Sequence, residues 1–138
     1  MDIVSHAIAG AATGALWGHP VAGAVAAVLP DIVIAGPRRA LPSTLYRFTH
    51  SYLAFLIVSL LVLFIEYNLA AAIALAYLSH LWLDAVTHGE QWAPRFLWPL
   101  EMVCFKNIPE WEFGNRTWWL GLLITIVYSL TCFTVAYA

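Results

Sequence analysis

The stretch Tyr77-Leu78-Ser79-His80-Leu81-Trp82-Leu83-Asp84-Ala85-Val86-Thr87-His88 closes a long apolar segment and carries three side chains that can bind a metal ion. Residues four apart lie on the same face of a helix, so His80 and Asp84 point the same way, with His88 near the edge of that face. His80 lies about 12 Å from His88 along such a helix. An unpaired carboxylate or imidazole in lipid is costly. The pattern therefore predicts a compensating group, and a bound metal ion is the simplest one.

The composition places this helix in a membrane protein. Hydrophobic residues make up 62% of the 138 residues and charged residues only 10%, whereas soluble domains are about half apolar and a quarter charged. We therefore predict an all-α integral membrane protein with a single domain, residues 1–138. The net charge of -2 gives no reason to expect a nucleic-acid partner.

Apolar segments predict a bundle of about five helices, of which the first two are short: residues 3–17, 21–34, 52–65, 69–88 and 118–137. The first two segments are rich in alanine and glycine, which allow close helix packing in a bilayer. Since a spanning helix needs about 20 residues, they form either a buried hairpin or helices that extend past the lipid. Residues 89–117 mix charged side chains with tryptophans, as expected of an interfacial loop.

Folding these segments back and forth brings all Lys and Arg residues to one side of the membrane: Arg38, Arg39, Arg47, Arg95, Lys106 and Arg116. The positive-inside rule makes that side cytoplasmic. We therefore expect a protein of the cell (inner) membrane whose basic end, and any site there, faces the cytoplasm.

The same path gathers five candidate metal ligands at the basic end: His6, Asp31, His50, His80 and Asp84. Imidazoles combined with carboxylates suit zinc, or manganese where oxygen ligands dominate. Taken singly, His6 fits a surface or capping role and Asp31 a turn, while His80 and Asp84 could form a polar clasp between helices. Convergence of all five favours one shared divalent cation, because ionisable groups inside a membrane are rare.

For other polar residues the sequence allows either a functional or a purely structural role. Besides Asp84, the residues His88 and Glu90 at the mouth are candidate catalytic groups or are simply solvated. Thr49 and Ser51 either hydrogen-bond a ligand side chain or cap a helix. The arginines of the basic side suit a bound phosphate, although topology alone also explains them: Arg38, Arg39 and Arg47.

Several short motifs, in this order and spacing, resemble the YdjM-like family of LexA-regulated, membrane-bound, predicted metal-dependent hydrolases: Ser5-His6-x-x-x-Gly10, Leu29-Pro30-Asp31, Arg47-Phe48-Thr49-His50-Ser51, His80-Leu81-Trp82-Leu83-Asp84 with Thr87 and Gly89, and Trp98-Pro99-Leu100. That family is proposed to be similar to zinc-dependent phospholipase C enzymes, so the resemblance implies phosphoester hydrolysis. Val33 and Tyr46 stand where the family often has an acid and a histidine, which would reduce the number of ligands.

The sequence thus predicts a metal-dependent hydrolase that acts on a phosphoester of a lipid or other amphiphile, with membrane lipids as partners. One alternative is a metal-stabilised membrane scaffold whose loop, residues 90–116, contacts a partner protein. Another is a small transporter, which would need a polar path across the membrane; residues 52–65 and 118–137 offer few polar side chains for one. The sequence predicts no particular oligomeric state.

Overall fold

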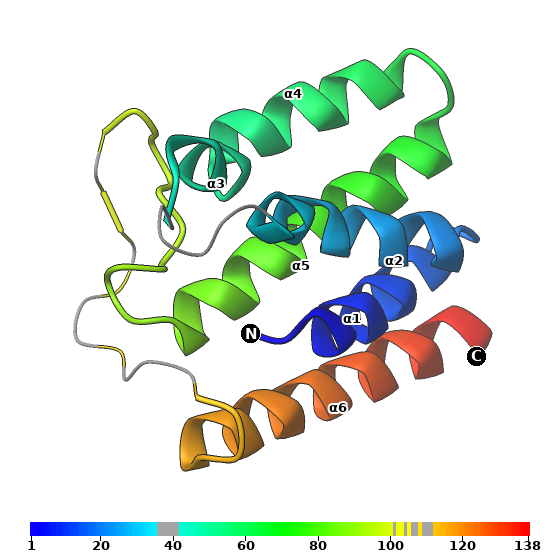
Figure 1. Cartoon of the computed structure of the whole chain (residues 1–138). Coiled ribbons are helices and arrows are strands. Elements are labelled where there is room, and N and C mark those ends of the chain that lie inside the picture. The colour runs from blue at the N-terminus through cyan, green and yellow to red at the C-terminus, as the bar shows by residue number, and fades with distance from the viewer. Residues whose placement is uncertain (36–41, 101, 104, 106–107, 109–111) are drawn as a thin grey trace.

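The computed structural model describes residues 1–35, 42–100, 102–103, 105, 108 and 112–138. Within these residues the chain is helical and has no strand. Figure 1 shows its six α-helices and one 3₁₀ helix: α1 (Ile3–Ala15), α2 (Pro20–Val28), η1 (Leu29–Ala35), α3 (Thr44–Thr49), α4 (Tyr52–Leu63), α5 (Tyr67–Thr87) and α6 (Arg116–Tyr137). The predicted all-α fold is confirmed.

Two helices, α5 with 21 residues and α6 with 22, are long and apolar enough to cross a membrane. The remaining apolar helices are shorter, including α4 with 12 residues. The five predicted segments all appear as helices. The additional helix α3 precedes α4 and is capped by the Ser43 side chain, which accepts a hydrogen bond from the Tyr46 N–H at 3.1 Å.

Helices α1 and α2 form a tight hairpin. Gly18, with φ of 78°, makes the turn, and Pro20 opens α2 at a position where its missing N–H costs nothing. Beyond the turn, Gly10 and Gly14 of α1 lie directly against Gly23 of α2. The two backbones can approach this closely only because no side chain separates them.

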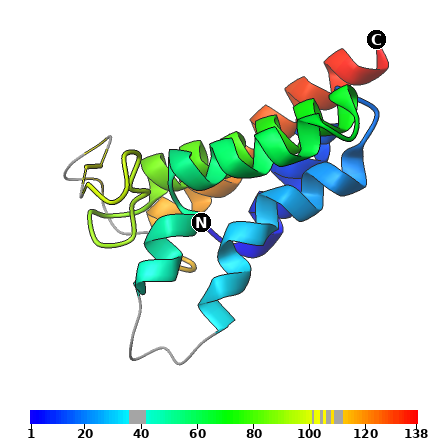
Figure 2. The same cartoon turned by 90° about the horizontal axis from the view of Figure 1, so that it is seen from above.

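Helix α5 is the centre of the bundle, with α1, α2 and α4 packed around it (Figures 1 and 2). Its small buried residues, Ala72 and Ala76, let the α1–α2 hairpin approach, while Leu81 packs in a cluster with Ala54 and Tyr77. Helix α6 lies on the other side of α1 and meets α5 at few positions. The hairpin therefore delivers residues of α1 and η1 to the carboxyl-terminal half of α5.

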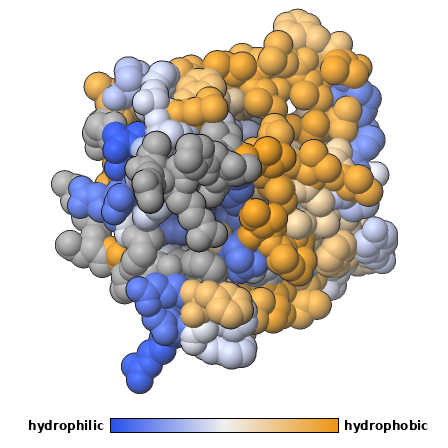
Figure 3. All heavy atoms as spheres, viewed as in Figure 1, coloured by the Kyte–Doolittle hydropathy of each residue, from blue (hydrophilic) through white to orange (hydrophobic). Residues whose placement is uncertain are grey.

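The surface is banded. Hydrophobic side chains cover the top and the right-hand part of the face in Figure 3, while hydrophilic side chains gather at the end where α5 stops and α6 begins, and again at the opposite edge. Large apolar side chains on this surface are well exposed, among them Phe64 at 88% and Leu61 at 65%. Such a belt between two polar ends is what a bilayer requires of the surface it surrounds.

The polar group at the amino-terminal end of α5 is Glu66. Its carboxylate accepts hydrogen bonds from the N–H groups of Asn68 at 2.7 Å and Leu69 at 2.6 Å, and lies 3.2 Å from His19 Nε2. Partial desolvation opposes ionisation, but these N–H donors and His19 together lower the pKa of Glu66 below its ordinary value of 4.5. The carboxylate therefore caps α5 and links it to the α1–α2 turn.

Glu66→Ala is expected to loosen the first turn of α5 without disturbing the rest, because capping carboxylates act locally. Hydrogen exchange at Asn68 and Leu69 should become faster. Since the pKa of Glu66 is lower in the folded chain, its contribution is present above about pH 4.5 and is lost on acidification below that. Exchange in the wild type should therefore approach that of the variant in acid. Equal exchange at neutral pH would contradict this role.

Candidate metal centre

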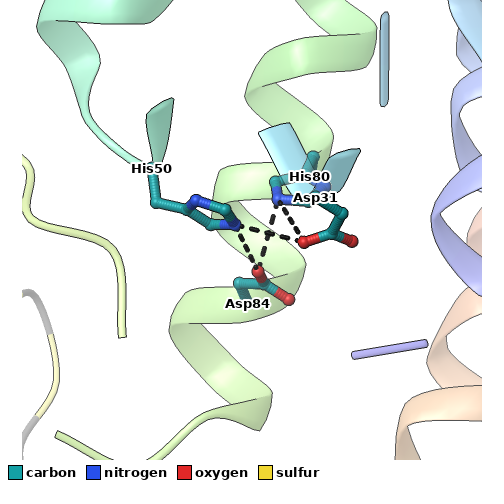
Figure 4. A group of neighbouring side chains, drawn as sticks. All are labelled: Asp31, His50, His80 and Asp84. Carbon is teal, nitrogen blue, oxygen red and sulfur yellow. Dashed lines mark hydrogen bonds and ion pairs between the residues drawn. The ribbon is translucent and has the colours of Figure 1, made fainter. Parts of the chain in front are cut away.

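Four buried side chains from three segments meet beside α5: Asp31 of η1, His50 at the end of α3, and His80 and Asp84 of α5. One ligand atom from each lies within 4.8 Å of the others. All four are at most 6% exposed. Figure 4 shows the two imidazoles and the two carboxylates pointing toward one another. The convergence predicted for these four residues is therefore present.

The distances between these atoms match those around a small cation. His50 Nε2 lies 3.3 Å from Asp31 Oδ1 and 3.6 Å from Asp84 Oδ2. His80 Nε2 lies 3.3 Å from Asp84 Oδ2 and 4.0 Å from Asp31 Oδ1. Tetrahedral zinc with bonds of 2.0–2.1 Å places neighbouring ligand atoms about 3.3 Å apart. A divalent ion would thus need only small shifts to bind all four.

The position of the proton on His80 is set by the backbone of α2. His80 Nδ1 donates to the Ala27 carbonyl oxygen at 2.7 Å, so the neutral ring carries its lone pair on Nε2. That nitrogen is buried and has no hydrogen-bond partner among the described residues. A backbone carbonyl that fixes one ring nitrogen while the other faces a cluster of acids is typical of a histidine that binds a metal.

His50 is held in the same way by α3. Its Nδ1 donates to the Tyr46 carbonyl oxygen at 2.9 Å, and its ring stacks on the Tyr46 ring with centroids 3.8 Å apart. Burial lowers the pKa of His50, and the neighbouring Asp31 offsets this only in part. The imidazole is therefore neutral at neutral pH, and its Nε2 presents a lone pair to Asp31.

This arrangement leaves acceptors facing acceptors. In the tautomer that carries its hydrogen on Nδ1, each ring turns the Nε2 lone pair toward a carboxylate oxygen, at 3.3 Å between His50 and Asp31 and at 3.3 Å between His80 and Asp84. Such a contact is repulsive unless a positive charge lies at its centre. The donor set and the orphaned Nε2 of His80 therefore fit a divalent cation bound by two imidazoles and two carboxylates.

The second oxygen of Asp84 faces a different group of side chains. Asp84 Oδ1 lies 2.9 Å from His6 Nε2, 3.3 Å from His88 Nε2 and 2.6 Å from the amino group of Met1, which also contacts His88. The His6 ring lies over that of His80, with centroids 3.9 Å apart. His6 thus adjoins the four-residue cluster through Asp84, on the side away from His50.

The remaining predicted residues occupy varied positions. Thr49 Oγ1 lies 3.2 Å from His50 Nδ1 and donates to the Pro30 carbonyl at 3.2 Å, so it joins a ligand to η1. Ser51 caps α4 by accepting from the Ala54 N–H. Glu90 is exposed, and its carbonyl accepts from Arg95 at 2.9 Å. Arg47 lies in the last turn of α3. Arg38 and Arg39 lie outside the described residues.

Two residues near the centre were not predicted from the sequence. Tyr46 contacts His50 twice and donates from its hydroxyl to the Trp92 carbonyl at 3.0 Å. Arg95 is buried, and its backbone N–H donates to the His50 carbonyl at 2.9 Å. Both connect His50 to the segment after α5. The contact of Arg95 with His50 joins distant segments and has no local sequence signal. Tyr46 lies four residues before His50, a helical spacing that could have indicated their contact.

Comparison with known proteins gives one match. A family model described as YdjM inner membrane protein matches residues 1–138, and so includes all four residues of the cluster. No curated protein and no solved structure matches the chain.

Proposed function

The chain belongs to the YdjM inner membrane protein family, and from this premise we propose that it is a membrane-bound, metal-dependent hydrolase that cleaves a phosphoester of a lipid or other amphiphile. The observation that carries the proposal is the pair of imidazoles, His50 and His80, whose Nδ1 atoms bond backbone carbonyls and whose Nε2 atoms face the buried carboxylates of Asp31 and Asp84. The proposed cation is zinc, or manganese as an alternative.

In this proposal Asp31, His50, His80 and Asp84 hold the ion. A bound divalent cation lowers the pKa of water and polarises a phosphoryl oxygen, which is the chemistry that hydrolysis needs. His88 is 14% exposed and lies beside Asp84, so it can meet both solvent and the cluster. We assign it the role of general base that takes the proton of the attacking water, with the exposed Glu90 as the other candidate.

The position of the cluster supports the proposed substrate and orientation. It lies near the carboxyl-terminal end of a helix long enough to span the bilayer, and thus close to the headgroup layer. Headgroup phosphates are the groups such a site would meet. Arg47, together with Arg38 and Arg39 of the same basic side, is proposed to bind the phosphate, and the positive-inside rule directs this end to the cytoplasm.

A second function, the metal-stabilised scaffold, is supported by the burial of the ligands. His50 and His80 are 0% exposed and Asp84 is 1% exposed. A closed shell of four protein ligands is characteristic of structural zinc sites, whereas catalytic sites keep a position for water. In the scaffold the ion would join η1, α3 and α5, and no group would have to accept a proton.

His88→Gln separates the two functions, because His88 is not among the four proposed ligands. In the hydrolase, loss of a general base is expected to lower turnover by about 10²- to 10⁴-fold while the cation content stays unchanged. The measurement is release of the phosphorylated headgroup from phosphatidylcholine, phosphatidic acid and an isoprenyl diphosphate in detergent micelles, with zinc or manganese supplied.

The matched control is His19→Gln at the opposite end of α5, which should retain full turnover. Glu90→Gln tests the other candidate base in the same assay. If the zinc-loaded wild type releases no product from any of these amphiphiles, the hydrolase is refuted and the scaffold is favoured. If His88→Gln and Glu90→Gln both keep wild-type turnover, the assignment of the base is wrong.

A further inference from the structure

A cleft lies between α5 and α6, on the side of α5 away from the metal cluster. Its volume is about 570 Å³, and its walls are largely hydrocarbon, including Leu75, Leu78, Trp82 and Val86 of α5 and Ile124 of α6. It exists because α6 packs on α1 and meets α5 at few positions. Figure 1 shows α1 lying between the other two helices, and Thr13 of α1 lines the cleft.

The few polar groups in the cleft are satisfied by the protein itself. Thr13 donates from its hydroxyl to the Ala9 carbonyl at 2.8 Å and lies 2.7 Å from the Tyr128 hydroxyl. Ser79 donates to the Ala76 carbonyl at 2.7 Å. Because these groups already have hydrogen-bond partners in the protein, a water molecule in the cleft would gain few hydrogen bonds. Apolar cavities of this kind stay dry or bind apolar molecules.

The size of the cleft suits a slender apolar occupant. Its volume is about 570 Å³. It falls within the range of about 300–1,000 Å³ that holds a small molecule, and a single hydrocarbon chain has the right narrow shape.

The length of the cleft matches one leaflet. From Val86 to Leu75 is about 16 Å along α5, and the hydrocarbon region of one leaflet is about 15 Å deep. The Val86 end lies within two residues of both Asp84 and His88, and the Leu75 end lies toward the centre of the bilayer. A chain anchored in the headgroup layer at the metal-cluster end would therefore reach the whole cleft.

We infer that this cleft binds one acyl chain of a glycerophospholipid from the leaflet on the metal-cluster side. Glycerophospholipid chains are the hydrocarbon that fills the bilayer around α5 and α6, and the chain would replace solvent-free empty space with dispersion contacts. Binding of an acyl chain in this cleft does not depend on the proposed hydrolase activity. Only the identification of the bound lipid as a substrate would depend on that activity.

The test uses the full chain in vesicles of dioleoylphosphatidylcholine that contain phosphatidylcholine with a diazirine midway along one acyl chain. After irradiation, mass spectrometry locates the labelled residues. We expect label on the cleft residues Leu78, Trp82 and Ile124 in excess of the exposed α6 residues Leu123 and Val127, which bulk lipid also touches. Equal labelling of the two sets would overturn the inference, as would crosslinks between two copies of the chain.

Ile124→Trp places an indole in the cleft and should abolish the label at Leu78 and reduce it at Trp82, which is 45% exposed. Leu123→Trp is the matched control: the Leu123 side chain is 57% exposed and does not line the cleft, so the label should persist. If both variants retain the label, the chain does not occupy the cleft. Should Ile124→Trp fail to fold, the map of the wild type still decides. His80→Ala should keep the label while losing the cation, which separates failure here from failure of the hydrolase.

Discussion

Replacing His80 by alanine is expected to leave the purified protein without its divalent cation. The substitution removes an Nε2 that lies 3.3 Å from Asp84 Oδ2 and 4.0 Å from Asp31 Oδ1 and has no hydrogen-bond partner among the described residues. Loss of a mere hydrogen-bond partner of a ligand lowers metal affinity about 10- to 100-fold, so loss of the ligand itself should cost more than about 100-fold. Elemental analysis of protein purified with zinc or manganese measures the effect.

His19→Ala is the matched control, since it removes the same side chain from the opposite end of α5, where it pairs with Glu66. This variant should retain the full complement of metal. Because an ion bound only to the folded state raises stability, a chelator should lower the thermal midpoint of the wild type and of His19→Ala but leave that of His80→Ala unchanged. Full metal content in His80→Ala would remove this residue from the site.

The part of the site that the sequence predicts well is the part that a single helix defines. His80 and Asp84 share a face because they are four residues apart, and the apolar run around them predicts α5 nearly to its ends. Asp31 and His50 follow from topology, since back-and-forth helices return their ends to one side of the membrane. Segments this apolar have few alternatives to forming helices in a membrane, which is why the order of helices was predictable.

The orientation of individual side chains was not predictable. His6 is predicted to share the cation with His50, and this stays a prediction. The spacing did not show that its Nε2 would face Oδ1 of Asp84 while His50 and His80 face Oδ2. A carboxylate has two oxygens, and the spacing of residues along the chain does not determine which oxygen each neighbouring side chain contacts. Ser51 caps α4, which is one of its two predicted roles, whereas the stacking of the Tyr46 ring on His50 was not predicted. These details depend on backbone positions set by packing.

That packing includes the close approach of α1 and α2, so Gly23→Ala is expected to have a large effect for a methyl-sized change. A Cβ at Gly23 would overlap the Gly10 carbonyl oxygen and come within 2.8 Å of Gly14 Cα. Both obstacles are backbone atoms and cannot rotate away. Overpacking usually costs about 1–3 kcal/mol, and more where only the backbone can yield. Unfolding of the detergent-solubilised protein in increasing denaturing detergent measures the loss.

The matched control on the same helix is Val25→Ala, at a side chain that is 58% exposed, and it should change stability little. The two alanine variants also separate packing from metal binding. Since α1 carries His6, η1 follows α2 with Asp31, and the Ala27 carbonyl fixes His80, forcing the hairpin apart should weaken the cation site as well as the fold. If Gly23→Ala and Val25→Ala unfold at the same concentration of denaturing detergent, the close approach of α1 and α2 does not stabilise the fold. If it is destabilised yet binds the cation normally, the ligands depend on α3 and α5 more than on the hairpin.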